Sequence, residues 1–169
     1  MMMPRDSLPP RLRRPRRVVV PAYLLTAVIA VYSSACGGGE PASEWSQEPW
    51  AADAVMPADF VKELSGPDKP VIVCTAPPVL YRVGHIPGAV LHGPGISPAA
   101  IGSLTTWAEA LPRSTKIVIY CGCCPIRDCP NLNLPYEALK NLGFTNVRVL
   151  ALADSFRVDW VQHGYPIER

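Results

Sequence analysis

The chain has 169 residues, a length typical of one domain with short flanking segments. Six of its 16 basic residues but only one of its 14 acidic residues lie within residues 1–36, so the rest of the chain is slightly acidic. That charge balance excludes the basic patch by which proteins bind nucleic acid, and we expect no nucleic-acid partner.

The first segment, residues 1–36, has the layout of a bacterial export signal. Arginines dominate its start, an apolar stretch follows over Val18–Tyr32, and three small residues precede Cys36. Basic, apolar and small-residue regions in that order are typical of secretory signals. The apolar stretch is shorter than the roughly 20 residues that a membrane-spanning helix needs. We therefore predict export, and the alternative is an uncleaved membrane anchor.

Cys36 and its flanks resemble the end of a bacterial lipoprotein signal. Three glycines follow Cys36, as in a flexible tether. The resemblance implies that Cys36 becomes a lipidated N-terminus, which anchors a periplasmic or cell-envelope protein to the membrane. Ser33 departs from the pattern, which usually has leucine at that place. Ordinary signal cleavage, with Cys36 left as a free thiol, is the alternative.

Residues 37–55 are rich in Gly, Glu, Ser, Pro and Ala, a composition that predicts a surface tether. Within this segment, Trp45 and Trp50 are the residues that could pack onto the edge of the folded domain. The domain itself is expected over residues 56–169, which are enough to bury one modest core.

Helix and strand patterns alternate along the predicted domain. Apolar residues at helical spacing predict helices over 57–64, 99–110, 135–142 and 154–161, and short apolar runs predict strands over 71–73, 89–91, 116–120 and 147–150. Continuous apolar strands alternating with amphipathic helices indicate an α/β fold, a parallel sheet covered by helices on both faces. Ligands of such sheets bind beyond the carboxyl ends of the strands. Cys121 directly follows the clearest strand, so it is the expected catalytic residue.

The loop after that strand carries four cysteines within residues 121–129. A thiolate at Cys121 would be stabilised where backbone N–H groups of the turn converge into an anion-binding nest. Arg127 could reach back and hold an anionic substrate. The expected anion-binding positions are Gly122, Cys123, Cys124 and Ile126, and the expected resolving thiols are Cys123, Cys124 and Cys129.

The cysteines alone allow three other interpretations of this loop. In an oxidising compartment they could form disulfides that only make the loop rigid. The pair formed by Cys121 and Cys124 superficially resembles a thioredoxin active site and could exchange thiols and disulfides. Thiolates could also bind a soft metal ion such as Cu(I).

Three segments in order, together spanning about residues 57–169, resemble rhodanese-like domains. Residues 84–89 read Gly-His-Ile-Pro-Gly-Ala and look like the segment before the second strand of that family. Cys121, at a strand end, matches the position of the family's catalytic cysteine. The family's closing Trp-x-x-x-Gly-x-Pro pattern is matched by Trp160, Gly164 and Pro166. Neither the redox nor the metal interpretation accounts for residues 84–89, so both rank below the rhodanese interpretation.

The resemblance implies a five-stranded parallel sheet and the transfer of sulfur through a cysteine persulfide. By carry-over, Cys121 is the sulfur-carrying nucleophile, and Arg127 corresponds loosely to the arginine that ends the family's loop. The implied partners are a small anionic sulfur donor, such as thiosulfate, and a thiol acceptor. We expect neither a cofactor nor a metal ion.

The chain departs from the rhodanese pattern in three ways. The segment that begins at Cys74 reads Cys-Thr-Ala where the family usually has Asp-x-Arg. The Cys-x5-Arg spacing that ends at Arg127 resembles rhodanese-related cell-cycle phosphatases and some arsenate reductases, which typically have His in place of Tyr120. The additional loop cysteines set this chain apart from thiosulfate sulfurtransferases. A non-catalytic rhodanese-fold binding domain is therefore a further alternative.

Overall fold

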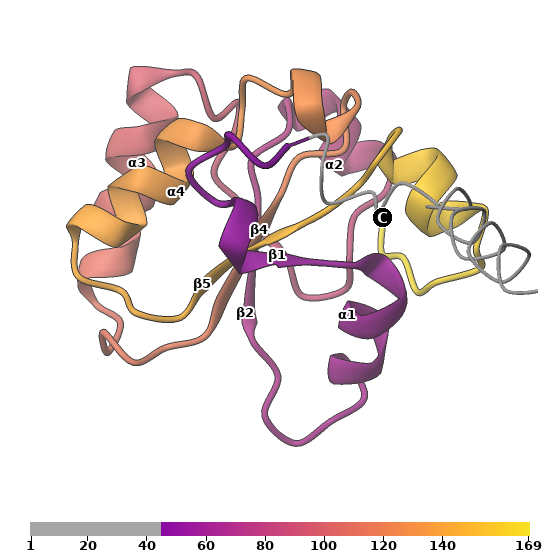
Figure 1. Ribbon diagram of the computed structural model, residues 1–169, viewed down its shortest axis with the longest axis horizontal. Coiled ribbons are helices and arrows are strands. Elements are labelled where there is room, and N and C mark those ends of the chain that lie inside the picture. Colours follow the sequence, from indigo (N-terminus) through magenta and orange to yellow (C-terminus); the bar gives the residue numbers. More distant parts are fainter. Residues whose placement is uncertain (1–44) are drawn as a thin grey trace, which may run out of the picture. The chain divides into compact units, whose positions relative to one another are not determined.

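A single parallel sheet of five strands lies at the centre of the structure, a computed structural model that describes residues 45–169 (Figure 1). The strands are β1 (Ala54–Val55), β2 (Val71–Cys74), β3 (Val90–Leu91), β4 (Ile117–Tyr120) and β5 (Val147–Leu150). Their order is β1-β5-β4-β2-β3, and every pairing is parallel. All four residues of β4 are at most 1% exposed. The apolar run that predicted a buried strand is therefore the middle of the core.

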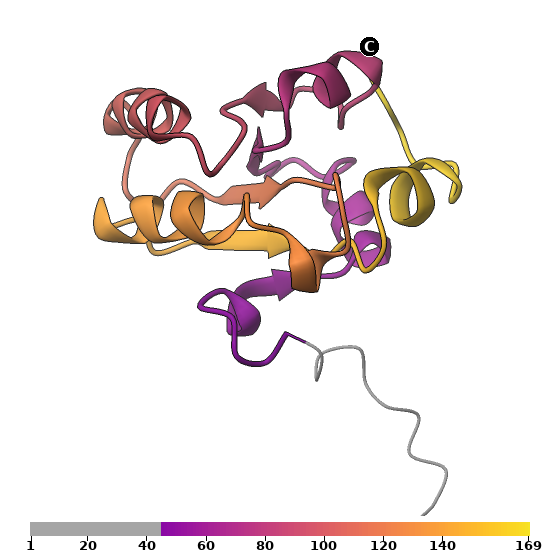
Figure 2. The same cartoon turned by 90° about the horizontal axis from the view of Figure 1, so that it is seen from above.

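Helices cover both faces of this sheet, as Figures 1 and 2 show. They are α1 (Pro57–Glu63), α2 (Pro78–Val83), α3 (Pro98–Glu109) and α4 (Asn133–Asn141), with the 3-10 turns η3 (Ala51–Asp53) and η4 (Ile126–Asp128) and the π-helix η5 (Arg157–Val161). α3 and α4 lie together on one face, and α1 and η5 lie on the other. There, the fully buried rings of Phe60 and Trp160 have centroids 6.0 Å apart. The predicted α/β fold is confirmed.

Most predicted elements lie within a residue or two of their expected bounds, but the last helix begins later than predicted. In place of a helix over residues 154–161, the structure has the shorter π-helix η5. The carboxylate of Asp159 accounts for the difference. Its Oδ2 accepts hydrogen bonds of 2.7 and 2.8 Å from the N–H groups of Asp154 and Ser155, which holds those two residues in a turn.

The sequence patterns did not predict α2 and β1. α2 has six residues, too few for a periodic pattern to show, although Pro78 stands in its first turn as is common at helix starts. β1 has only two residues, Ala54 and Val55, which pair with Val149 and Leu150 of β5. Elements this short are recognised only once their neighbours in the fold are known.

Residues 45–55 belong to the folded domain, so the predicted tether over residues 37–55 is wrong for this part. Trp45 and Trp50, which were expected to pack onto the domain edge, are part of the core, with 3% and 1% of their surface exposed. The indole Nε1 of Trp50 also donates a 2.7 Å hydrogen bond to Oδ1 of Asn133, at the start of α4. Burial of two indole rings outweighs the turn-forming composition of the segment.

The predicted export signal over residues 1–36, its lipidation site Cys36 and residues 37–44 lie outside the described residues. Within residues 45–169, no helix is both long enough and apolar enough to cross a membrane.

The end of the chain is joined to the segment that follows α2. The backbones of His85 and Glu168 exchange hydrogen bonds of 2.9 and 2.8 Å, and Figure 2 shows the C-terminus beside α2. Trp160 Nε1 donates to the carbonyl of Pro166 at 2.9 Å, which holds η5 against the C-terminal segment. The Gly-His-Ile-Pro-Gly-Ala segment and the closing Trp-x-x-x-Gly-x-Pro pattern are thus linked in space.

Candidate active site

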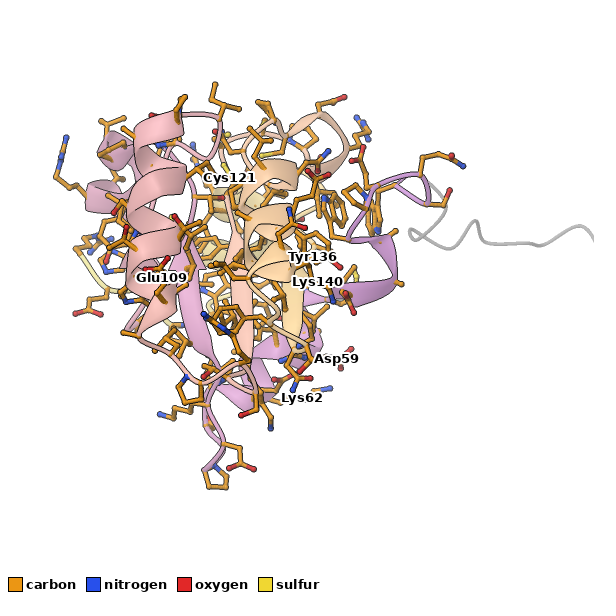
Figure 3. All side chains as sticks on the ribbon, turned by 90° about the vertical axis from the view of Figure 1, so that its left-hand side faces the viewer. Asp59, Lys62, Glu109, Cys121, Tyr136 and Lys140 are labelled. Carbon is orange, nitrogen blue, oxygen red and sulfur yellow. The ribbon has the colours of Figure 1, made fainter. Side chains whose placement is uncertain are left out.

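Cys121 is the first residue after β4, at the carboxyl end of the central strand. The backbone N–H and the hydroxyl of Thr75 both donate to the carbonyl of Tyr120, at 2.8 and 3.1 Å. These two bonds fix the end of β4 and with it the start of the loop. Figure 3 shows Cys121 at the end of the molecule far from Asp59 and Lys62 of α1. The cysteine singled out from the sequence therefore lies where parallel sheets bind ligands.

The loop turns sharply at Gly122, whose φ of +71° lies in the left-handed region. A Cβ at this position would lie 2.5 Å from Cβ of Phe156 and 2.9 Å from Leu152, so a side chain does not fit. The N–H of Phe156 donates to the carbonyl of Gly122 at 3.1 Å, and the N–H of Ile126 donates to that of Leu152 at 3.0 Å. Close packing against the segment after β5 thus fixes the path of the loop.

The sulfur atoms of Cys123 and Cys129 gather around that of Cys121. All three sulfur atoms lie within 4.8 Å of one another, and those of Cys121 and Cys123 are 3.1 Å apart. Cys124 lies outside this group, and its sulfur is 3.2 Å from that of Cys123. The cysteines within residues 45–169 are all free thiols. Of the predicted resolving thiols, the structure therefore brings Cys123 and Cys129 to Cys121.

Hydrogen bonds lower the pKa of the Cys121 thiol to about 6. The main cause is the hydrogen bond with the Cys129 thiol, and the thiol and backbone N–H of Cys123 and the amide of Asn131 add to it against the opposing effect of burial. Burial raises the pKa of Cys123 to about 12, and the hydrogen bond to Cys121 raises the pKa of Cys129. Of these three thiols, Cys121 is therefore the one that ionises first.

Asn131 is a site residue that the sequence did not single out. It is buried, and its Nδ2 lies 3.6 Å from the sulfur atoms of both Cys121 and Cys123. Its Oδ1 accepts a 3.2 Å hydrogen bond from the N–H of Ile96, which fixes the direction of the amide. The sequence could have pointed to Asn131 only as a polar residue soon after Cys129. Its hydrogen-bond partner Ile96 is too far away in the sequence to be recognised.

A cavity of about 380 Å³ lies beside the cysteine. Cys121, itself only 3% exposed, lines it together with Arg157 and Arg169. The apolar side chains in its wall come from α2, the segment after β5 and the end of the chain, and include Leu80, Val83, Phe156, Val161 and Ile167. The cavity has room for a small molecule and carries positive charge in its wall, a feature that the sequence patterns did not predict.

Two predicted anion-binding residues are placed differently from expectation. The backbone N–H of Ile126 already donates to the carbonyl of Leu152, so it is engaged within the protein. Arg127 lies on η4 with 48% of its side chain exposed, its Nε is 3.4 Å from the carboxylate of Asp128, and it is not among the residues that line the cavity. Cys123 fits the prediction better, since its N–H bonds the sulfur of Cys121.

The same three sulfur atoms could also hold a metal ion. Among the side chains of residues 45–169, Cys121, Cys123 and Cys129 form the one group of His, Cys, Asp or Glu whose ligand atoms lie close enough to share an ion. A set made only of sulfur suits soft ions such as Cu(I) or Zn²⁺.

Comparison of the sequence with models of known protein families gives a match. The family model of the rhodanese-like domain matches residues 56–152, a span that includes residues 84–89 and Cys121. No curated protein sequence matches the chain.

Solved structures share the fold at low sequence identity. The rhodanese-like domain of an Anabaena sp. protein is 21% identical, with 69% of this chain and 78% of that chain covered and a TM-score of 0.52. A Bacillus halodurans protein is 19% identical over 68% of this chain and 75% of its own, with a TM-score of 0.53. A thiosulfate sulfurtransferase from Pseudomonas aeruginosa is 20% identical over 69% of this chain but 19% of its own, with a TM-score of 0.51.

Proposed function

Because this chain belongs to the rhodanese-like domain family, we propose that it is a sulfurtransferase in which Cys121 carries sulfur as a persulfide. The observation that best supports this is the placement of one sulfur atom at the end of β4, in contact with Cys123, Cys129 and Asn131. Several hydrogen-bond donors around one sulfur favour the thiolate, which is the nucleophilic form of cysteine. The nucleophile is therefore prepared by its surroundings.

The proposed reaction has two halves. In the first, the Cys121 thiolate attacks the outer sulfur of a small anionic donor such as thiosulfate. A sulfur–sulfur bond forms at Cys121, the bond within thiosulfate breaks, and sulfite leaves with its electron pair. In the second, a thiol acceptor takes the outer sulfur, and Cys121 returns to the thiolate. Neither half needs a cofactor.

Three arginines are candidates for holding the donor, because a guanidinium binds an oxyanion through paired N–H groups. Arg127 is the candidate from the sequence and lies half exposed on η4. Arg157 and Arg169 are the candidates from the structure, since both line the cavity together with Cys121. Steady-state kinetics distinguish them: the arginine that binds the donor raises the KM for thiosulfate when it is replaced by alanine.

We further propose that the domain acts outside the cytoplasm, held to the membrane by a lipid on Cys36. The support is the order of basic, apolar and small residues over residues 1–36.

Persulfide formation tests the sulfur-transfer proposal directly. Reduced protein is treated with thiosulfate, alkylated and digested with trypsin, and the peptide of residues 117–127 is weighed. We expect a release of sulfite that matches the amount of protein and, in samples alkylated at early times, one added sulfur atom on Cys121. Cys121→Ser should give neither, whereas Cys124→Ser, a matched change in the same loop, should give both. Sulfite release by the Cys121→Ser protein would overturn the proposal.

A second candidate function, the handling of a soft metal ion, is favoured by the gathering of three sulfur atoms within 4.8 Å. Elemental analysis of the natively purified protein distinguishes the two. Stoichiometric copper or zinc that disappears in Cys129→Ser would support metal handling, and metal-free protein that forms the persulfide would support sulfur transfer.

A further inference from the structure

We infer that Cys129 is an internal resolving thiol. It attacks the inner sulfur of the Cys121 persulfide, so that the domain releases sulfide and closes a Cys121–Cys129 disulfide. The inference rests on the proposed function and adds to it the identity of the thiol that discharges the persulfide. It also makes sulfide release a second activity of the same site.

The position of Cys129 carries this inference. Its sulfur lies within 4.8 Å of the Cys121 sulfur, and the two side chains are hydrogen-bonded. Cys121 is 3% exposed and Cys129 is 8% exposed, so an external thiol has little direct access to the inner sulfur of the persulfide. A thiol that is already in contact reacts as part of the same molecule, which favours it strongly over a thiol that must diffuse in.

Cys129 is better placed for this role than the two cysteines nearer in sequence. A disulfide between Cys121 and Cys123 would close a small ring across Gly122. That glycine has little freedom to adjust, because Phe156 contacts it closely and donates a hydrogen bond to its carbonyl. The sulfur of Cys124 contacts Cys123 instead.

Cys129 approaches from outside that tight turn, since it follows η4. The two sulfur atoms then need only close to the bonding distance of about 2.05 Å.

The step balances without an added oxidant. The Cys129 sulfur forms a bond to the inner sulfur of the Cys121 persulfide, and the bond between the inner and outer sulfur atoms breaks. The outer sulfur leaves with the electron pair and takes up the proton of the Cys129 thiol, so it departs as the hydrosulfide ion. The Cys129 thiol is oxidised to a disulfide, and the outer sulfur is reduced.

The product sets a requirement on the next reaction in the sequence. The Cys121–Cys129 disulfide must be reduced before Cys121 can accept sulfur again, and a dithiol reductant of the thiol–disulfide exchange class does this. Sulfide release by this domain would therefore depend on a partner reaction that supplies two thiols.

Trypsin separates the competing disulfides by mass. Cleavage after Lys116, Arg127 and Lys140 places Cys121 on the peptide of residues 117–127 and Cys129 on the peptide of residues 128–140. A Cys121–Cys129 disulfide joins these two peptides. A disulfide from Cys121 to either of the nearer cysteines stays within the first peptide.

The experiment treats the reduced full chain with thiosulfate, without air or added thiol, and measures sulfide and linked peptides over time. We expect stoichiometric sulfide and joined peptides from the wild type and from Cys124→Ser, whose sulfur lies outside the group around Cys121. Cys123→Ser lacks a thiol that contacts Cys121, so it should give the same products more slowly. In Cys129→Ser the persulfide should accumulate on residues 117–127 without sulfide. Serine keeps a hydrogen-bond donor at position 129, so a purely structural role of Cys129 predicts normal sulfide release from this variant.

The outcomes separate this inference from the proposed function. A wild-type persulfide that forms and persists without sulfide release overturns the inference and leaves the sulfurtransferase proposal standing. Loss of sulfide release in Cys123→Ser rather than Cys129→Ser overturns the assignment to Cys129. If thiosulfate loads no sulfur, the proposed activity on thiosulfate fails, and the same comparison of variants after loading with inorganic polysulfide still decides the role of Cys129.

Discussion

The side-chain amide of Asn131 lies 3.6 Å from the sulfur of Cys121, close enough to donate a hydrogen bond to a thiolate. Its carbonyl oxygen is held on the other side by the backbone N–H of Ile96. A buried amide fixed in this way favours the charged form of the thiol, because it offers a donor where water has little access.

Replacement of this amide should make the thiolate harder to form. We expect Asn131→Ala to raise the pKa of Cys121 by about one unit, the effect of one weak hydrogen bond to a charged group. The pH dependence of iodoacetamide alkylation at Cys121 measures the shift. Asn141→Ala, at the exposed end of α4, is the control and should leave the profile unchanged. An unaltered profile in Asn131→Ala would show that the amide does not support the thiolate.

Alkylation of the wild-type protein should reflect the order of the thiol pKa values. The pKa of Cys121 is lowered to about 6, so its thiolate is scarce below that pH and predominates above it. The pKa values of Cys123 and Cys129 are raised, so both should stay protonated and unlabelled by iodoacetamide as Cys121 titrates. Peptide mapping after brief labelling at mildly acidic pH checks this. Earlier labelling of residues 128–140 than of residues 117–127 would contradict it.

A charge in the central strand should unfold the domain. Ile119 is fully buried in β4, so Ile119→Asp places an unpaired carboxylate in the core, at a cost of about 3–5 kcal/mol. That is a large share of the stability of an ordinary domain. Urea unfolding followed by tryptophan fluorescence measures the loss. Ile96→Asp, at a position that is 54% exposed, is the matched control, and equal stability of the two variants would argue against the central position of β4.

Residues 45–55 should contribute to the stability of the domain through the indole ring of Trp50. Trp50 is 1% exposed and donates to Asn133, so Trp50→Ala should lower the free energy of unfolding by about 3 kcal/mol. Thermal unfolding measures this change. A chain that begins at Trp45 should keep the stability of the full chain, whereas one that begins at Met56 should be less stable. Equal stability of the two truncated chains would show that residues 45–55 do not stabilise the domain, as expected of a tether.

Lipidation at Cys36 has a test that does not depend on the fold. We expect the mature protein to fractionate with membranes and Cys36→Ser to be released from them or to stay unprocessed. Cys36→Ser leaves the domain itself intact, so persulfide formation by the purified variant is the control. The same membrane fraction and the same mature mass for the wild type and Cys36→Ser would rule out the lipid anchor.

The sequence by itself determined the fold and the position of Cys121, because both depend on local patterns. The apolar side chains of the continuous run Ile117–Ile119 can all be buried only inside a sheet that is covered on both faces. A residue directly after such a strand must lie at the carboxyl edge, and Cys121 does. The helices whose apolar residues recur at helical spacing could be predicted for the same reason.

Only the tertiary structure decided which groups surround Cys121 and where the domain begins. Asn131 and Ile96 meet because two distant loops reach the same edge of the sheet, and Arg157 enters the cavity wall because η5 packs there. Cys129, not Cys124, reaches Cys121 because the packing of Gly122 fixes the path of the loop. The composition of residues 45–55 suggested a tether, but burial of their two indole rings against a core built from later residues stabilises them as part of the domain.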